Sequence, residues 1–254
     1  MAEPKINSGI VSLVPSQTEL LVYLGLEDAL IGITKFCVHP AHLRKTKQIV
    51  GGTKNLRMAV IEQLNPALIL ANKEENEQAA IEALAKRFKV WVSDIKNWNE
   101  ALAMIASVGT LTDTDAKAKR LIADLEMAKS KFQAVTFNSS KHYKTLYLIW
   151  REPWMSIGSD TFIHEMMQIA GFQNCCAHLS RYPVVDEETI KSLSPEVILL
   201  SSEPYPFKEK HIVELQKLAP QALILLADGE MFSWYGSRML QAFDYFELLQ
   251  ARIC

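Results

Sequence analysis

The sequence predicts an α/β protein with two homologous lobes of parallel-sheet βα units, joined by one long α-helix. Three observations predict this class. Short β-branched or leucine-rich runs alternate with segments of helical period, which is typical of βα units. One stretch between two such regions has the pattern of a single long helix. Two sequence patterns recur in the same order in both halves. The predicted boundaries are 1–112 for the N-terminal lobe, 113–137 for the linking helix and 138–254 for the C-terminal lobe.

Seven runs have the length and composition of buried strands in a parallel sheet. Each is followed by a segment of helical period, except where the long helix intervenes. The predicted strands are Ile10–Val14, Leu30–Thr34, Ala67–Ala71, Val90–Ser93, Thr145–Trp150, Val197–Ser201 and Ala222–Ala227.

The predicted linking helix runs from about Asp113 to Val135. We expect Thr112 or Asp113 to cap its start and residues 138–140 to end it. Charged residues cover one side, and an apolar stripe covers the other. The stripe consists of Ala116, Leu121, Ile122, Leu125, Ala128 and Phe132.

Two internal matches indicate that the lobes are related. Ile61–Glu74 aligns without a gap on Ile190–Glu203, 129 positions later, so that a helix end, a proline, a strand and a glutamate recur together. Thr18–Leu26 also aligns with His164–Phe172, and both predict an amphipathic helix stopped by glycine. The common order of the matches favours duplication over chance similarity of generic βα units.

Composition and charge exclude several classes of protein. The 27 Lys and Arg residues nearly balance the 29 Asp and Glu, giving a formal charge of −2, so we expect no nucleic-acid partner. No apolar run approaches the roughly 18 residues that cross a bilayer. The motifs GxGxxG, GxxxxGK[ST], GxSxG and HExxH are absent, and we therefore expect no enzyme activity.

Aromatic and cationic side chains gather in the loops after predicted strands. In parallel sheets ligands bind at the carboxyl ends of strands, so these loops predict a cleft for a large, flat, partly apolar ligand. Core packing stays open as the alternative for the tryptophans. The candidates are Phe36 and His39 after the second strand, Trp150, Arg151 and Trp154 after the fifth, and Trp234, Tyr235 and Arg238 after the last.

Two further sets of residues carry possible chemistry. Cys37, His39 and His42 have a loose metal-ligand spacing, which supports an alternative class, a cytoplasmic metal-binding protein or enzyme. The pair Cys175–Cys176 followed by His178 has no CxxC partner, and the default for the four cysteines is the reduced thiol. Ser16 to Glu19 has the form of a capping box, whose helix N-terminus would present N–H groups to a ligand.

Glu74 and Glu203 occupy equivalent positions just beyond equivalent predicted strands. Paired carboxylates of this kind can bind paired arginines on a symmetric partner through charge-assisted hydrogen bonds. The alternative is that they are two unrelated surface carboxylates.

Together these patterns resemble the helical-backbone metal receptor family. The resemblance extends from Ile10 to about Leu249 and rests on the long helix, the two glutamates and three motifs. The motifs are Ile-Val-Ser-Leu-Val-Pro-Ser-Gln-Thr-Glu at Ile10–Glu19, Leu-Asn-Pro at Leu64–Pro66 and Leu-Ser-Pro at Leu193–Pro195. Members are class III substrate-binding proteins of ABC importers for vitamin B12 and ferric siderophores, and this chain is most similar to the cobalamin branch.

The resemblance implies a non-enzymatic monomer that holds a ligand between its lobes with little hinge motion. It implies docking on an ABC permease dimer through Glu74 and Glu203, with Glu75, Glu77 and Glu209 as competing neighbours. It implies no covalently bound cofactor and no metal held by protein ligands. The chain departs from the family pattern in two places. We expect no export signal in the chain as written, because the apolar run near its start is too short, and Asn72-Lys73 stands where B12 binders often carry a tryptophan.

Cobalamin is the expected ligand, with a ferric siderophore as the alternative. Stacking would come from Trp154, Trp234 and Tyr235 and polar contacts from Arg151 and Arg238; His39 would lie near the metal, with Phe36 and Trp150 completing the site. Only two arginines lie in these loops, which favours the corrinoid over an anionic ferric chelate. We expect a periplasmic or extracytoplasmic location if a leader was removed, and a cytoplasmic one if the chain is complete as written.

Overall fold

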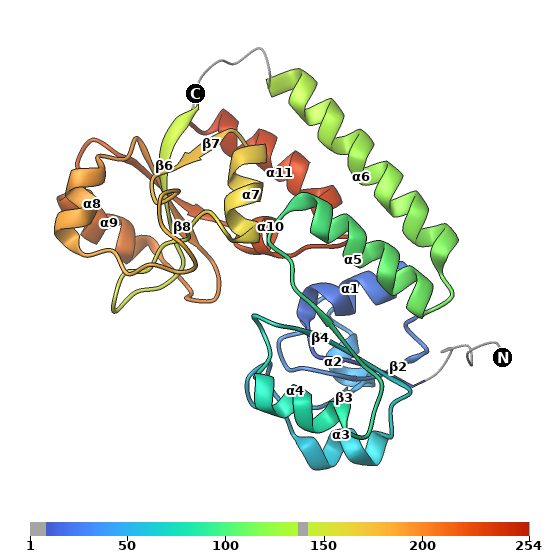
Figure 1. The fold of residues 1–254 in the computed structure, drawn as a ribbon. Coiled ribbons are helices and arrows are strands. Elements are labelled where there is room, and N and C mark those ends of the chain that lie inside the picture. Colours follow the sequence, from blue (N-terminus) through green and yellow to red (C-terminus); the bar gives the residue numbers. More distant parts are fainter. Residues whose placement is uncertain (1–8, 137–141, 254) are drawn as a thin grey trace. The chain divides into compact units, whose positions relative to one another are not determined.

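Two parallel β-sheets form the framework of the protein, one in each of two units (Figure 1). The computed structural model describes residues 9–136 and 142–253. The described part of the first unit lies within Met1–Ile95, Asn99–Leu125 and Trp234–Arg238. That of the second lies within Lys96–Trp98, Glu126–Ser233 and Met239–Cys254. The predicted α/β class with two parallel sheets is confirmed.

The first sheet has the order β3 (Gln48–Ile49), β2 (Leu30–Ile33), β1 (Ile10–Ser12), β4 (Leu68–Asn72) and β5 (Val90–Ser93). The second has the order β7 (Phe172–Asn174), β6 (Tyr143–Leu148), β8 (Val197–Ser201) and β9 (Leu223–Ala227). All seven predicted strands are present. The sequence analysis missed β3 and β7, because neither lies in an apolar run of the about four to eight residues that indicates a buried strand, whereas the equally short β1 lies in the run Ile10–Val14.

The helices alternate with the strands along the chain. In the first unit they are α1 (Pro15–Tyr23), α2 (Leu43–Thr46), α3 (Met58–Leu64) and α4 (Gln78–Ala85). Next come α5 (Trp98–Leu111) and α6 (Asp115–Thr136), which both contribute residues to the two units. The second unit adds α7 (Phe162–Ile169), α8 (Glu187–Leu193), α9 (Glu209–Leu218), α10 (Glu230–Ser233) and α11 (Met239–Ala251).

Helix α6 is the predicted long helix, with three differences. It begins at Asp115, because Asp113 has a left-handed φ of 57° and the buried Thr112 hydroxyl donates back to the Val108 carbonyl. The predicted caps at these two residues are therefore wrong. Ala116 is exposed, and Ala118 takes its place in the buried stripe. The predicted end at 138–140 lies outside the described residues, and the three-part domain division stays a prediction.

The predicted capping box at Ser16 is also wrong. Helix α1 begins at Pro15, and its N-cap residue, Val14, makes no side-chain cap hydrogen bond. Proline suits the first helical position because its φ is already helical and it has no N–H to leave unpaired. Ser16 thus lies inside the helix rather than at its cap.

The duplication predicted from the sequence is present in the backbone. The second sheet has the same strand order as β2-β1-β4-β5 of the first. Helices α3 and α8 both end in a left-handed residue, Asn65 (φ 45°, ψ 59°) and Ser194 (φ 43°, ψ 59°), before the equivalent strands β4 and β8. The two helix-stopping glycines, Gly25 and Gly171, have φ of 83° and 81°.

Each sheet is covered by helices on both faces, as the strand-helix alternation requires. In the second unit, α8 and α9 lie on one side of the sheet and α7 and α11 on the other (Figure 1). Leu146 and Leu148 of β6 face the α8–α9 core, whereas Tyr147 between them contacts Phe232 of α10. Because both faces of the sheet are buried, the loops that can reach a ligand lie at the carboxyl ends of the strands. No helix in the described parts of the chain is long and apolar enough to cross a membrane.

The two left-handed helix ends make a matched prediction about stability. Replacing Ser194 by glycine removes the steric cost of the left-handed conformation and should raise the free energy of unfolding by up to about 1 kcal/mol. Asn65→Gly should gain less, because asparagine tolerates this conformation. Urea unfolding measures both. Ser194→Val is the control and should destabilise; a neutral valine would contradict the assigned backbone conformation.

Candidate functional site

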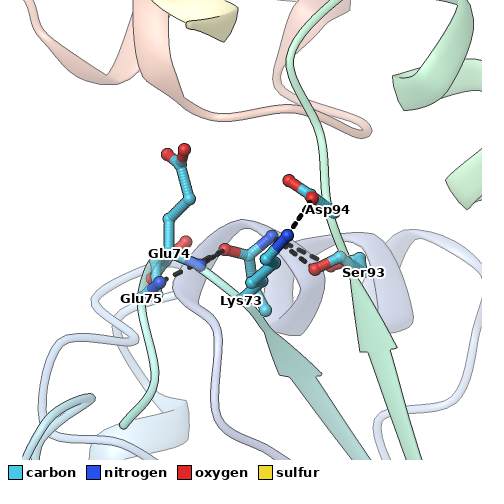
Figure 2. Close-up of polar contacts among 6 residues, drawn as sticks. Lys73, Glu74, Glu75, Ser93 and Asp94 are labelled. Atoms are coloured by element: carbon cyan, nitrogen blue, oxygen red, sulfur yellow. Dashed lines mark hydrogen bonds and ion pairs between the residues drawn. The ribbon is translucent and has the colours of Figure 1, made fainter. Parts of the chain in front are cut away.

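Two equivalent loops carry glutamates at the carboxyl ends of β4 and β8. The last residue of each strand holds its loop through its side chain. In the first unit, Asn72 Oδ1 accepts the backbone N–H groups of Glu74 (2.8 Å) and Glu75 (3.2 Å) (Figure 2). In the second, Ser201 Oγ accepts the N–H of Glu203 (3.4 Å) and donates to its carbonyl (2.5 Å). Both are local side-chain turns that set where a glutamate emerges.

The Asn72 side chain is itself held by buried neighbours. Its Nδ2 donates to the carbonyl (3.2 Å) and hydroxyl (3.1 Å) of Ser93 on β5, and its backbone N–H donates to Asn76 Oδ1 (2.8 Å). Lys73 beside it pairs with Asp94 at 3.0 Å, as Figure 2 shows. The backbone that carries Glu74 is therefore preset by the sheet.

The Glu203 carboxylate is oriented as well as its backbone. Ser233, the last residue of α10, donates its hydroxyl to Glu203 Oε1 at 2.6 Å. A Cβ on Gly229 would lie 2.7 Å from Glu203 Cγ and 2.4 Å from Ser201 Oγ, so this close approach requires glycine. Tyr147 donates to Ser201 Oγ at 3.2 Å, and its burial raises its pKa, so that it stays a donor.

Glu74 and Glu203 are both half-buried. The backbone of each is held by its loop, and part of each side chain is accessible to a partner. Among their neighbours, Glu75 accepts a hydrogen bond from Tyr235 at 3.3 Å. Glu77 and Glu209 are exposed, at the starts of α4 and α9. Equivalent backbone positions and equivalent side-chain turns distinguish Glu74 and Glu203 from these three. The docking role of the pair stays a prediction.

Residues Trp234–Arg238, which we call the strap, belong to the first unit although the chain on both sides belongs to the second. All five residues are buried. Trp234 packs edge-on against His39, with ring centroids 5.6 Å apart, and the Arg238 guanidinium lies over the Trp234 ring at 5.1 Å. The strap thus brings together candidates that the sequence analysis had placed in different lobes.

A buried ion pair anchors the strap. Arg238 Nε and Nη2 bind the two carboxylate oxygens of Glu19 at 2.9 and 2.8 Å, and the two side chains are 8% and 16% exposed. Burial and the nearby Glu75 raise the pKa of Tyr235 well above its ordinary value, so its hydroxyl stays protonated and donates to Glu75. These side chains hold the strap in place.

In the second unit, the loop after β6 places Trp150 and Arg151 differently from Trp154. Trp150 is 39% exposed and packs edge-on against Tyr205 at 5.6 Å. Trp154 is 5% exposed and stacks on Phe207 with an interplanar angle of 6°. Arg151 lies over the Trp154 ring at 4.4 Å and forms a two-pronged pair with Glu214, which raises its pKa. Trp150 therefore presents the accessible ring.

In the first unit, Phe36 is the accessible aromatic side chain of the loop after β2. It is 49% exposed, and Lys35 Nζ lies 5.0 Å from its ring centroid. His39 is half-buried against Trp234 in the same loop. The ligand-binding role of the eight candidates stays a prediction. Their exposure nonetheless separates the accessible Phe36 and Trp150 from the buried Trp154, Trp234, Tyr235 and Arg238.

The alternative metal site at Cys37, His39 and His42 is not formed. The Cys37 thiol is buried between the hydroxyls of Thr18 (3.0 Å) and Thr34 (3.3 Å), and burial raises its pKa. His42 instead pairs with Glu27 at 2.8 Å. Over residues 9–136 and 142–253, no three His, Cys, Asp or Glu side chains are grouped closely enough to hold a metal ion.

Cys175 and Cys176 fit the default prediction of reduced thiols. Both are free, together with Cys37. Burial raises the pKa of Cys175 to about 12 and also raises that of Cys176. Thiols that stay protonated at neutral pH are poor metal ligands and poor nucleophiles.

Sequence reasoning missed the residues that support the glutamates, namely Asn72, Ser201 and Ser233. A signal for the first two was available, because the aligned repeats both end an apolar strand with a small polar residue two positions before the glutamate. No comparable signal marks Ser233, or the pairing of Glu19 with Arg238, since these contacts join segments distant in the sequence.

Comparison with known proteins gives a consistent match. The profile of a family described as periplasmic binding protein matches residues 10–222. An uncharacterized ABC transporter substrate-binding lipoprotein, YvrC of Bacillus subtilis strain 168, is 28% identical over 206 residues. That match covers 78% of this chain and spans 63% of the relative's length. The vitamin B12-binding protein of Photorhabdus laumondii subsp. laumondii is 26% identical over 194 residues, 76% of this chain and 70% of the relative.

A solved structure shares the fold over nearly the whole chain. The periplasmic heme-binding protein RhuT from Roseiflexus sp. RS-1, in its apo form, superimposes with a TM-score of 0.86. It covers 97% of this chain and 99% of the other, at 19% sequence identity. This likeness shows that the two proteins have the same fold.

The buried pair of the strap predicts a large loss of stability on truncation. Arg238→Ala leaves the Glu19 carboxylate buried without its partner and should lower the free energy of unfolding by about 3 kcal/mol. Replacing both residues by methionine should cost less than the sum of the two single methionine variants, because no unpaired charge remains. Chemical denaturation checks both. Arg120→Ala, in an exposed pair with Asp124 on α6, is the control and should be near neutral; equal losses at Arg120 and Arg238 would contradict the anchoring role.

Proposed function

We propose that this chain, which belongs to the periplasmic binding protein family, is the substrate-binding component of an ABC importer and carries a corrinoid such as cobalamin. The observation that carries the proposal is the pair of equivalent loops after β4 and β8. Each loop carries one glutamate whose backbone N–H is held by a side-chain hydrogen bond. A duplicated acidic contact suits a permease built from two related subunits. The substrate-binding lipoprotein and the vitamin B12-binding protein among the relatives support it.

The side chains available for a ligand suit a large, weakly charged chelate. Trp150 and Phe36 expose aromatic faces in the loops at the carboxyl ends of β6 and β2, where parallel sheets bind ligands. Flat apolar faces favour stacking against a macrocycle, and His39 in the same loop as Phe36 can donate to or accept from its polar substituents.

Charge argues against a ferric siderophore, the alternative ligand. An anionic ferric chelate requires several cationic side chains to offset its charge. The two arginines of the candidate set, Arg151 and Arg238, are already paired with Glu214 and Glu19. Cobalamin, which carries amides around an apolar ring, does not require them. We place the protein outside the cytoplasm, where an importer collects its substrate.

Cyanocobalamin binding tests the ligand assignment. Titration should quench tryptophan fluorescence, and the coloured ligand should co-elute with the protein in gel filtration. Trp150→Ala and Phe36→Ala should each raise the Kd by roughly tenfold, as loss of an aromatic contact does. The matched control is Tyr23→Ala, because Tyr23 is 45% exposed on α1 and lies outside the loops. Absence of cyanocobalamin binding, with retention of a ferric catecholate under the same conditions, would transfer the assignment to siderophores.

Charge reversal tests the docking assignment. Glu74→Lys and Glu203→Lys should each reduce uptake of labelled cyanocobalamin into proteoliposomes containing the permease and its ATPase by tenfold or more, because each removes a charge-assisted contact and adds repulsion. Cyanocobalamin affinity should not change. Glu77→Lys, at the exposed N-cap of α4, should leave uptake intact. Uptake unaffected by both reversals would refute docking through these residues.

A further inference from the structure

The strap joins three features that the proposed function treats separately. Its first residue, Trp234, packs on His39 in the loop after β2. Its second, Tyr235, donates to Glu75 in the loop that carries Glu74. The residue just before it, Ser233, donates to the carboxylate of Glu203. Three consecutive residues thus contact a candidate ligand loop and both glutamate loops.

The strap has little freedom to absorb a displacement. Trp234, Tyr235, Ser237 and Arg238 are each 7% exposed or less, and Arg238 is held by two charge-assisted hydrogen bonds to Glu19. Ser233 directly precedes Trp234 and is joined to this held segment by one peptide bond.

Glu203, which accepts the Ser233 hydrogen bond, is equally constrained. Glu203 is held at its backbone by Ser201, at its carboxylate by Ser233 and along its side chain by Gly229, where no Cβ would fit. With the backbone and the stem of the side chain held, the Ser233 hydrogen bond orients the carboxylate. Glu74 is held at its backbone by Asn72 and Lys54, through contacts outside the strap.

We propose that Ser233 is a positioning residue for Glu203, because its hydroxyl orients the carboxylate that docks on the permease. This inference rests on the proposed function of the glutamates. It predicts an asymmetry between two docking residues that the sequence repeat makes equivalent. Loss of the Ser233 hydroxyl weakens docking through Glu203 and leaves docking through Glu74 unchanged.

A double-mutant cycle on docking tests the positioning role. Binding to the permease–ATPase complex is measured in nanodiscs. The complex used is the one that requires this protein for cyanocobalamin uptake. Ser233→Ala should weaken binding about tenfold, the effect of one charge-assisted hydrogen bond, and Ser233→Thr should restore most of it. In a Glu203→Ala background, Ser233→Ala should have no further effect. An equal loss in both backgrounds would assign Ser233 a general structural role and overturn the proposal.

The asymmetry has its own test with the same readout. In a Glu74→Ala background, Ser233→Ala should retain its full effect. Ser192→Ala removes an exposed hydroxyl on α8 and is the control for loss of a hydroxyl. Loss of the Ser233→Ala effect in the Glu74→Ala background would overturn the asymmetry.

A measurement on the isolated protein separates this inference from the proposed function. With ¹³C-labelled glutamate, Ser233→Ala should shift the Glu203 carboxyl resonance and leave that of the exposed Glu209 unchanged. This result can be obtained even if no permease binds, in which case only the docking proposal fails. An unchanged Glu203 resonance in Ser233→Ala would overturn the positioning role directly.

Discussion

The buried ion pair between Arg238 and Glu19 is the interaction on which the arrangement of the candidate site depends. An arginine and a glutamate out of water are tolerated only when each satisfies the other, and here both carboxylate oxygens accept from one guanidinium. The pair holds a five-residue segment in the first unit, although the chain on either side of it belongs to the second. Trp234 and Tyr235 lie buried in this anchored segment, where they contact His39 and Glu75.

The two repeats have the same backbone conformation but differ in the side chains that hold their glutamate loops. Asn65 and Ser194 occupy the same left-handed conformation, and Asn72 and Ser201 perform the same turn at the ends of β4 and β8. Asparagine reaches two backbone N–H groups, whereas the shorter serine holds only the glutamate two residues on. The second loop gains its extra support from Ser233, which binds the carboxylate itself. Two glutamates with the same place in the fold are thus held by different means.

Burial divides the aromatic candidates in a way that their loop positions do not predict. Trp150 and Trp154 lie four residues apart in one loop, yet the first is 39% exposed and the second 5% exposed in the core. Trp154 stacks on Phe207, which comes from the segment between β8 and α9, and Arg151 of its own loop also lies over its ring. A loop position after a strand indicates that a side chain can reach a ligand. Whether a core partner already covers its ring depends on packing.

The sequence by itself determined the α/β class, seven of the strands, the long helix and the internal duplication, because these depend on local periodicity and on similarity between segments. It also located the two equivalent glutamates. The tertiary structure decided where the strap lies, that Cys37 and His42 are engaged by Thr18 and Glu27 rather than available to a metal, and that Ser233 binds Glu203. Each of these is a contact between residues far apart in the sequence, and such contacts are chosen by packing and by the need to pair buried charges, which no local pattern encodes.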